Sequence, residues 1–301
     1  MTGVIPKLSP NWKLGSVRST YDKTTIRYAL YKKLSETLDC CVVFLNGRSE
    51  WIEKYDYIPD LLDLPKNCGF LTWDHRGQGA SEGTRYHVDS FDQFAEDSQA
   101  VIQSVLKDIP IFLIGHSTGG LIGLYATLKS LISPEAIALS SPLLMLPDKP
   151  VGRNLSRPIA HTLTKMGMSK VRSGEATLVE FSENQLTHCY EGFQRIEQAP
   201  YGNQSPTMGW IDAAFEATEF VFDETVLGSY TTPTLVLGGS EEEIVDPEGF
   251  QEWVRIMNQC SPTVIKYASI QGARHEILNE IPRLRDKAIE LINHWIREYL
   301  S

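Results

Sequence analysis

The amino-acid sequence predicts an α/β fold, with a mostly parallel central sheet, helices on both of its faces and a mainly helical cap insertion. Short apolar runs, typical of strands buried on both faces, alternate along the chain with segments of helical periodicity. Between residues 143 and 229 this alternation stops, and helical segments containing scattered methionine and aromatic residues replace it. A glycine-rich break around Ser117 lies where one predicted strand turns into a helix.

The first part of the chain supplies the edge of the sheet and its first buried strands. Residues 16–22 and 26–32 are short segments with Val, Tyr, Ile and Thr on either side of a polar connection, which predicts an antiparallel hairpin at the sheet edge. Residues 40–46 and 68–74 are continuous apolar runs, as expected for strands between helices. Residues 51–64 predict a helix that connects these two strands, so a parallel sheet with right-handed crossovers follows.

The same alternation continues through the rest of the core. Ser90 opens a predicted helix that extends to Leu106 and has its apolar residues on one side. The remaining predicted elements are the strand 109–114, the helix 121–130, the strands 136–140 and 233–238, the helix 250–257, the strand 264–270 and the closing helix 284–299.

These segments divide the chain into a core and an insertion. Residues 1–142 and 230–301 form the two parts of the core, and residues 143–229 form the helical cap. Because the insertion follows a predicted strand of a parallel sheet, we expect it to cover the carboxyl edge of that sheet.

The composition limits the classes of partner. The chain has 301 residues and a formal net charge of −10, which disfavours nucleic acid as a partner and offers no attraction to anionic lipid surfaces. The five cysteines are an odd number and none has the spacing of paired metal ligands, so we expect reduced thiols in a reducing compartment. We also expect no metal ion and no cofactor.

The hydropathy pattern bears on the cellular compartment. Residues 1–11 lack the apolar core of a secretory signal, and no window reaches the roughly 18 apolar residues of a membrane span. We therefore expect a cytoplasmic protein that makes at most transient, peripheral contact with the inner membrane. The sequence leaves the oligomeric state open.

The segment Gly115-His-Ser-Thr-Gly119 fits the pattern G-x-S-x-G. In this pattern a strand turns at once into a helix and lifts a nucleophilic serine above the sheet. The backbone is crowded at such a corner, so residues without a Cβ are needed there. Because a predicted strand precedes the motif and a predicted helix follows it, Ser117 is the predicted nucleophile, and the alternative is a plain Gly/Ser turn.

A serine hydroxyl needs an adjacent base, and the base needs an acid that orients it. In α/β-hydrolases the acid and then the histidine follow the serine, on loops after later strands. Of the seven histidines, His275 follows the strand 264–270 and is the predicted base, whereas His116 is expected to point away from the reacting face. The loop after the strand 233–238 offers four acids, and spacing alone does not choose among Glu241, Glu242, Glu243 and Asp246.

The negative charge that develops on the acyl oxygen needs two backbone N–H donors. Thr118 follows the nucleophile and begins its helix, where unpaired N–H groups and the helix dipole favour negative charge. The second donor is expected in the loop after the strand 40–46, at Arg48. Residues 74–81 form another polar loop, for which we expect a structural turn near the rim of the site.

Six segments carry a resemblance to a known family. They are Asp74-His-Arg-Gly-Gln-Gly-Ala-Ser81, Gly115-His-Ser-Thr-Gly119, Glu241-Glu-Glu-Ile-Val-Asp246 and Gly272-Ala-Arg-His-Glu-Ile-Leu278, with Leu186-Thr-His188 and Pro206-Thr-Met-Gly-Trp210 in the insertion. Together they resemble the bacterial lysophospholipases related to monoglyceride lipases. The resemblance implies an α/β-hydrolase fold with a cap and a serine enzyme that hydrolyses esters. It also implies that the acid lies four residues before the aspartate of the Val-Asp pair, which selects Glu242 and leaves Asp246 as the alternative.

The sequence departs from that family pattern at two positions. Asn46-Gly47 stands where many relatives carry His-Gly, so the oxyanion loop is inferred from its position and from Gly47. Glutamate replaces the aspartate that is common in monoglyceride lipases. The longer side chain is the reason why Asp246 stays an alternative to Glu242.

These motifs predict a serine hydrolase that cleaves carboxylic esters of lipid-like substrates, lysophospholipid or monoacylglycerol, through an acyl-enzyme on Ser117. We expect the cap to act as a lid over the acyl chain, with Met208 and Trp210 as substrate-binding residues, because such side chains adapt to flexible alkyl chains. The open alternative is that the apolar residues of the insertion only hold it on the sheet. Two other functions stay open: a carboxylesterase or thioesterase for small soluble esters, and a non-catalytic binding protein on a hydrolase scaffold.

Overall fold

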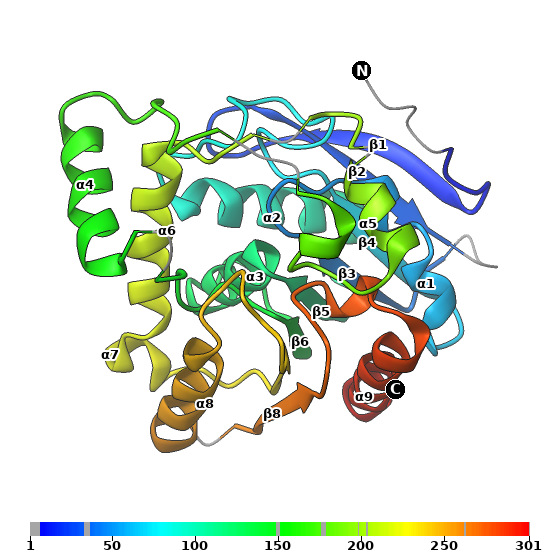
Figure 1. The fold of residues 1–301 in the computed structure, drawn as a ribbon. Helices are drawn as coiled ribbons and strands as arrows, with labels where there is room; N and C mark the ends of the chain where they lie inside the picture. Colours follow the sequence, from blue (N-terminus) through cyan, green and yellow to red (C-terminus); the bar gives the residue numbers. More distant parts are fainter. Residues whose placement is uncertain are drawn as a thin grey trace.

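The computed structural model of the protein describes residues 7–32, 37–148, 151–175, 179–197, 199–202, 204–261 and 263–300. The strands in this part of the chain are β1 (Trp12–Arg18), β2 (Thr25–Tyr31), β3 (Cys40–Leu45), β4 (Cys68–Trp73), β5 (Ile111–His116), β6 (Ala136–Ser140), β7 (Thr234–Gly239) and β8 (Ile265–Ile270). They form one sheet in the order β1-β2-β4-β3-β5-β6-β7-β8 (Figure 1).

The sheet is antiparallel at one edge and parallel elsewhere. β1 pairs with β2, and β2 with β4, in antiparallel register, whereas the pairs from β4 through β3 to β8 are parallel. The predicted edge hairpin is therefore confirmed, although β1 begins at Trp12 rather than at residue 16. The Trp12 ring packs edge-on against Tyr31, with the ring centroids 5.3 Å apart, and this contact extends the edge strand.

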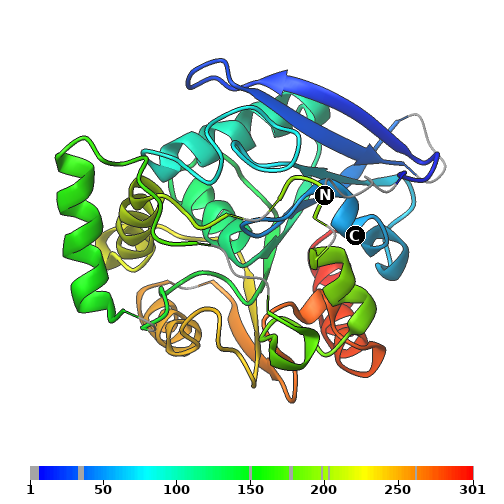
Figure 2. The same cartoon turned by 45° about the horizontal axis from the view of Figure 1, so that its top comes forward.

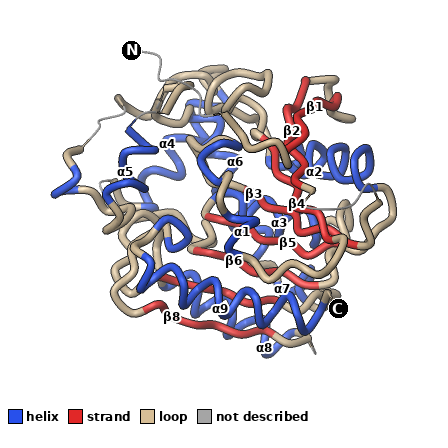
Figure 3. The backbone as a smooth tube through the Cα atoms, turned by 90° about the vertical axis from the view of Figure 1, so that its right-hand side faces the viewer, coloured by secondary structure: helices blue, strands red, loops and turns tan. Residues whose placement is uncertain are grey.

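Every residue of β3, β4, β5 and β6 is buried. These strands are buried because helices cover both faces of the sheet, and a separate apolar cluster lies on each side of it. One cluster contains residues of α2 (Phe91–Leu106), α3 (Thr118–Leu128) and α8 (Glu248–Cys260), and the other contains residues of α1 (Ile58–Leu61) and α9 (Pro282–Tyr299). Figure 3 looks onto the face that α9 covers. The continuous apolar runs of the sequence reflect this two-sided burial.

The single helix predicted over residues 51–64 is wrong. The chain instead forms a 3-10 helix, η1 (Ile52–Tyr55), and the short helix α1. Pro59 lies in the first turn of α1 and has no N–H to continue a helix from η1. The Ile52 amide donates to the Asp74 carboxylate across 2.9 Å, so the start of this segment is held by another loop.

Between β6 and β7 the chain leaves the sheet. This segment holds α4 (Arg153–Lys165), η2 (Phe181–Glu183), α5 (Tyr190–Glu197), α6 (Met208–Val221) and α7 (Glu224–Leu227). Its described part contains no strand, and one isolated bridge joins Arg172 to Thr207. In Figure 2, α4 and α6 lie together on one side of the molecule, and α5 lies on the other side near α9. Residues 149, 150, 176–178, 198 and 203 of the predicted cap, like residues 1–6, lie outside the described residues.

No helix in the described ranges combines the length and the apolar character that crossing a bilayer requires. The last short element, η3 (Ile277–Asn279), connects the loop that carries His275 to α9.

Candidate active site

Ser117 occupies a strained corner between β5 and α3. Its φ of 52° and ψ of −120° lie outside the regions that residues with a Cβ favour. Two backbone hydrogen bonds hold it there: the Ser117 amide donates to the Ser140 carbonyl across 3.0 Å, and the Ser117 carbonyl accepts from the Leu143 amide across 2.9 Å. This is the geometry that the G-x-S-x-G pattern predicts for a nucleophile elbow.

Gly119 allows α3 to begin directly against β3. A Cβ at this position would lie 2.2 Å from the Leu45 carbonyl oxygen and 2.4 Å from that of Asn46. Gly115 meets the same requirement on the other side of the corner, where a Cβ would lie 2.6 Å from the Gly120 Cα. The two glycines of the motif are thus explained by the close approach of two elements.

The structure brings Ser117, His275 and Glu242 together. The Ser117 hydroxyl lies 3.0 Å from His275 Nε2, and His275 Nδ1 lies 2.8 and 2.9 Å from the two carboxylate oxygens of Glu242. All three residues are buried, and Ser117 keeps 8% of its surface exposed. With Nδ1–H directed at the carboxylate, Nε2 is free to accept the serine proton, which is the arrangement of a nucleophile, a base and an orienting acid.

The surroundings of Glu242 keep its carboxylate ionised. Burial by itself raises the pKa of Glu242, but His275 and the amides of Ile244 and Val245 outweigh burial and lower the pKa below its usual value. The two amides donate to Glu242 across 2.8 and 3.2 Å. The alternative acid, Asp246, instead pairs with Arg153 and accepts the backbone amide of Glu248.

Thr118 and Arg48, the two expected oxyanion donors, both line the cavity that holds Ser117. Thr118 is the first residue of α3, so its amide has no acceptor within the helix. On either side of Arg48, the Gly47 amide donates to Glu50 and the Ser49 amide donates to Gln78. The Arg48 amide itself has no acceptor among the described residues.

The polar loop 74–81 braces the loop after β3. Besides the bond from Gln78 to the loop, His75 Nε2 donates to the Asn46 carbonyl across 3.0 Å. Asp74 accepts the amides of Ile52 and Ala80 across 2.9 and 2.8 Å. The prediction of a structural turn near the rim is confirmed.

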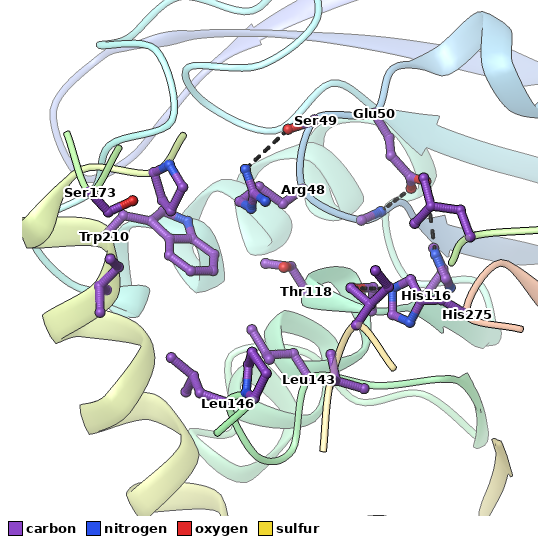
Figure 4. Close-up of a pocket in the computed structure, with 18 of the residues that line it drawn as sticks. Arg48, Ser49, Glu50, His116, Thr118, Leu143, Leu146, Ser173, Trp210 and His275 are labelled. Atoms are coloured by element: carbon purple, nitrogen blue, oxygen red, sulfur yellow. Dashed lines mark hydrogen bonds and ion pairs between the residues drawn. The ribbon is translucent and has the colours of Figure 1, made fainter. Parts of the chain in front are cut away.

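Ser117 and His275 line a cavity of about 640 Å³. Figure 4 shows His275 and other residues of its wall. Trp210 and Met208, both on α6, line the cavity, and Trp210 is almost fully buried. Most of the wall is apolar, and the segment between β6 and β7 supplies much of that apolar part. Those residues are Leu143, Leu146, Pro147, Val151, Ile159, Leu186, Ile196, Pro206, Met208, Trp210 and Ile211.

A buried polar network in the cavity wall was not predicted from the sequence. Glu50 accepts the Lys54 ammonium across 2.6 Å and the Tyr55 hydroxyl across 2.7 Å, and Lys54 also contacts Glu276 across 2.8 Å. Burial opposes the charge on Glu50, but Lys54 and His116 outweigh burial and lower the pKa of Glu50 to about 2. Because Glu50 also accepts the Gly47 amide, this network holds the loop after β3, where an oxyanion donor is expected.

His116 lies beside the reacting face, and the prediction that it points away is wrong. Its ring centroid is 4.9 Å from that of His275, and it lines the cavity. His116 Nδ1 donates to the Ser140 carbonyl across 3.0 Å. Burial lowers the pKa of His116 to about 4, so this imidazole is neutral at ordinary pH.

Among the residues that the structure describes, one group of side chains has the spacing of metal ligands. His161, Asp212 and Glu216, on α4 and α6, place one ligand atom each within 4.8 Å of one another. None of the three lines the cavity of Ser117, and exposed acidic groups commonly cluster without an ion.

Comparison with known proteins places this geometry in a family. The model of the serine aminopeptidase, S33, family matches residues 37–282. Rat monoglyceride lipase is 25% identical over 287 residues, which cover 91% of this chain and 88% of the relative. Lysophospholipase L2 of Escherichia coli K12 is 27% identical over 302 residues, which cover 93% of this chain and 86% of the relative.

A solved structure shares the fold. A soluble variant of monoglyceride lipase from Saccharomyces cerevisiae aligns with a TM-score of 0.77 and 18% identity, covering 98% of this chain and 96% of that chain. The family match spans most of the chain, from just before β3 to the start of α9. The chain therefore belongs to the serine aminopeptidase, S33, family, and it is a serine hydrolase with the α/β-hydrolase fold.

Proposed function

We propose that the protein hydrolyses carboxylic esters of single-chain lipids, lysophospholipids or monoacylglycerols, through an acyl-enzyme on Ser117. The observation that carries this proposal is the position of Ser117 and His275 in the wall of a mostly apolar cavity of about 640 Å³. A cavity of this size and lining is typical of a site that encloses a small apolar ligand and orients it with a few polar groups. The relatives of this chain include proteins named monoglyceride lipase and lysophospholipase L2.

The proposed reaction follows from the distances. Ser117 attacks the acyl carbonyl carbon while His275 Nε2, 3.0 Å away, takes the hydroxyl proton. Glu242 holds the imidazole in the tautomer that exposes Nε2 and stabilises its positive charge. The amides of Arg48 and Thr118 donate to the oxyanion. His275 then protonates the departing alcohol, and a water molecule, activated by the same imidazole, releases the fatty acid.

The cap is the proposed lid, and α4 is the part that meets lipid. Val151, just before α4, and Ile159, on α4, line the cavity, yet they are 46% and 41% exposed. Leu155, on the same helix, is 58% exposed, and Met166, just after it, is 67% exposed. This apolar surface suits transient contact with a micelle or a membrane surface. The compartment we propose is the cytoplasm, where five free cysteines stay reduced.

The test is a substrate panel with Ser117→Ala as its control. Decanoyl monoacylglycerol and decanoyl lysophospholipid, kept below their micelle concentrations, should be hydrolysed faster than an acetyl ester, and an aminoacyl p-nitroanilide should be cleaved poorly. Ser117→Ala should lose at least about 10⁴-fold in rate and all labelling by a fluorophosphonate, because the nucleophile is gone. A preference for the acetyl ester would favour the small-ester alternative, and retained labelling of the variant would contradict the role of Ser117.

A further inference from the structure

Arg48 brings a positive charge into the cavity of Ser117. Its side chain lines the cavity between Trp210 and Thr118 (Figure 4). The guanidinium carbon lies 5.8 Å from the centroid of the Trp210 ring, in the position of a cation over an aromatic face. Arg48 is half-buried, so the cavity wall replaces part of the water around the cation, and this burial lowers the pKa of Arg48.

No carboxylate among the described residues neutralises this cation. The two hydrogen bonds of its guanidinium both use Nη1, to the Ser49 hydroxyl across 3.2 Å and to the Gln204 carbonyl across 3.3 Å. The Nη2 and Nε donors thus have no acceptor within the described ranges. Two other arginines of this acidic protein differ: the half-buried Arg27 pairs with Glu53 and Asp74, and the buried Arg76 pairs with Asp22 and Asp97.

Two further arginines lie near Arg48. Arg48, Arg85 and Arg172 all act on the buried Tyr86 hydroxyl, where each opposes the rise in its pKa that burial causes. Arg85 donates to the Gly79 carbonyl across 2.7 Å, and Arg172 donates to the Ser205 carbonyl across 2.7 Å. Within the described ranges none of the three forms a salt bridge. A partly desolvated cation without a counter-charge is costly, so a ligand that supplies an anion gains free energy here.

We propose that Arg48 binds the phosphate of the substrate headgroup, so that this serine hydrolase selects lysophospholipids over monoacylglycerols. This inference rests on the proposed ester hydrolysis at Ser117 and names its substrate class. The guanidinium fork matches two phosphate oxygens, which is the geometry in which arginine is stronger than lysine.

The position of Arg48 suits this substrate because one residue meets both of its polar parts. The Arg48 amide is the proposed donor to the ester oxyanion, and its side chain leads away from that point toward Trp210 (Figure 4). In a lysophospholipid, a glycerol unit likewise separates the scissile ester from the phosphate. Ser49 and Ser173, which also line the cavity, add hydroxyls on this side.

The experiment compares three decanoyl esters: lysophosphatidylglycerol, monoacylglycerol and a neutral glycosylated glycerol of similar bulk to the phosphate headgroup. The measured quantity is the ratio of kcat/KM for the phosphate ester to kcat/KM for each neutral ester. The wild-type ratio should be at least tenfold. Arg48→Gln should lower it about tenfold to a hundredfold, chiefly through KM, because a charge-assisted contact to phosphate is lost. The ratio cancels any loss that a disturbed Arg48 amide imposes on all three esters.

Two more variants complete the design. Arg48→Lys keeps the charge and loses the fork, so its ratio should fall between those of the wild type and Arg48→Gln. Arg255→Gln, which changes an exposed arginine of α8 paired with Glu252, should leave the ratio unchanged. A wild-type ratio near one, or the same ratio in Arg48→Gln, would overturn the phosphate site while ester hydrolysis stands. If the wild-type protein cleaved none of the three esters, the proposed function itself would fail.

Discussion

Glu242 and Asp246 lie in the same loop, between β7 and α8, yet their surroundings differ. Glu242 contacts His275 and accepts two backbone amides, whereas Asp246 pairs with Arg153 of α4. The Asp246 carboxylate also accepts the Glu248 amide at the start of α8. On these contacts, Glu242 acts on the imidazole, and Asp246 joins the loop to the cap.

We expect Glu242→Gln to lower kcat by about 10³-fold to 10⁴-fold, because an amide in place of the carboxylate no longer fixes the imidazole tautomer. Asp246→Asn is the matched control, and it should lower kcat by less than about tenfold. Both values come from steady-state rates on one decanoyl ester, with thermal unfolding recorded to verify folding. A larger loss of kcat in Asp246→Asn would transfer the role of the acid to that residue.

At the scale of single elements, α6 supplies the part of the cavity wall that we expect to meet the acyl chain. Trp210 also packs against Phe91 of α2, with ring centroids 6.2 Å apart, so the same side chain attaches α6 to the core. The two interpretations of the insertion, as an acyl site and as an attachment, therefore share residues. A comparison across chain lengths separates them.

On esters of four to twelve carbons kept below their micelle concentrations, kcat/KM should rise with length. Each buried CH₂ contributes about 0.8 kcal/mol, so four more carbons give about 3 kcal/mol, on the order of a hundredfold. Trp210→Ala should flatten this slope. Phe220→Ala is the control on the same helix, since Phe220 packs on Tyr125 and does not line the cavity. An unchanged slope in Trp210→Ala would show that this residue only attaches α6 to the core.

The contact between α3 and β3 depends on Gly119. A Cβ there overlaps two backbone carbonyl oxygens, which cannot rotate away, so Gly119→Ala should lower the free energy of unfolding by about 3 kcal/mol or more. Gly228→Ala is the matched control, because Gly228 has a φ of −60° and a Cβ there would lie 3.7 Å from its nearest neighbour, the Glu224 carbonyl oxygen. Urea unfolding measures both variants. Equal stability of the two would show that α3 shifts to admit the methyl group.

For the whole molecule, acid stability follows from two buried histidines. Burial lowers the pKa of His75 and of His116 to about 4. An unfolded histidine titrates near 6.5, so below that pH the unfolded chain binds protons that the folded chain does not. The contribution of these imidazoles is therefore complete above about pH 6.5 and is lost progressively as the pH falls toward 4.

We expect the free energy of unfolding to fall by a few kcal/mol between pH 6.5 and pH 4, measured by urea titration at several pH values. His75→Gln should make this pH dependence shallower, since glutamine keeps a donor for the Asn46 carbonyl and does not titrate. His294→Gln, at an exposed position of α9, should leave it unchanged. The same slope in His75→Gln as in the wild type would exclude this histidine as its source.

The sequence alone determined the features that depend on neighbours along the chain. Apolar runs marked the strands that helices cover on both faces, and Gly115-His-Ser-Thr-Gly119 marked the corner that raises Ser117. The order of the loops placed His275 as the base candidate. These features could be predicted because local burial and local backbone geometry restrict which residues can stand at each position.

Only the tertiary structure decided the contacts between distant segments. It placed Glu242 rather than Asp246 against His275, and it joined Lys54 to Glu276, 222 residues away. It also turned His116 toward the site and divided the predicted helix 51–64 into η1 and α1. The physical reason is that a charged group or a free amide takes the partner that burial brings near it, and sequence spacing carries no record of which loops meet above the sheet.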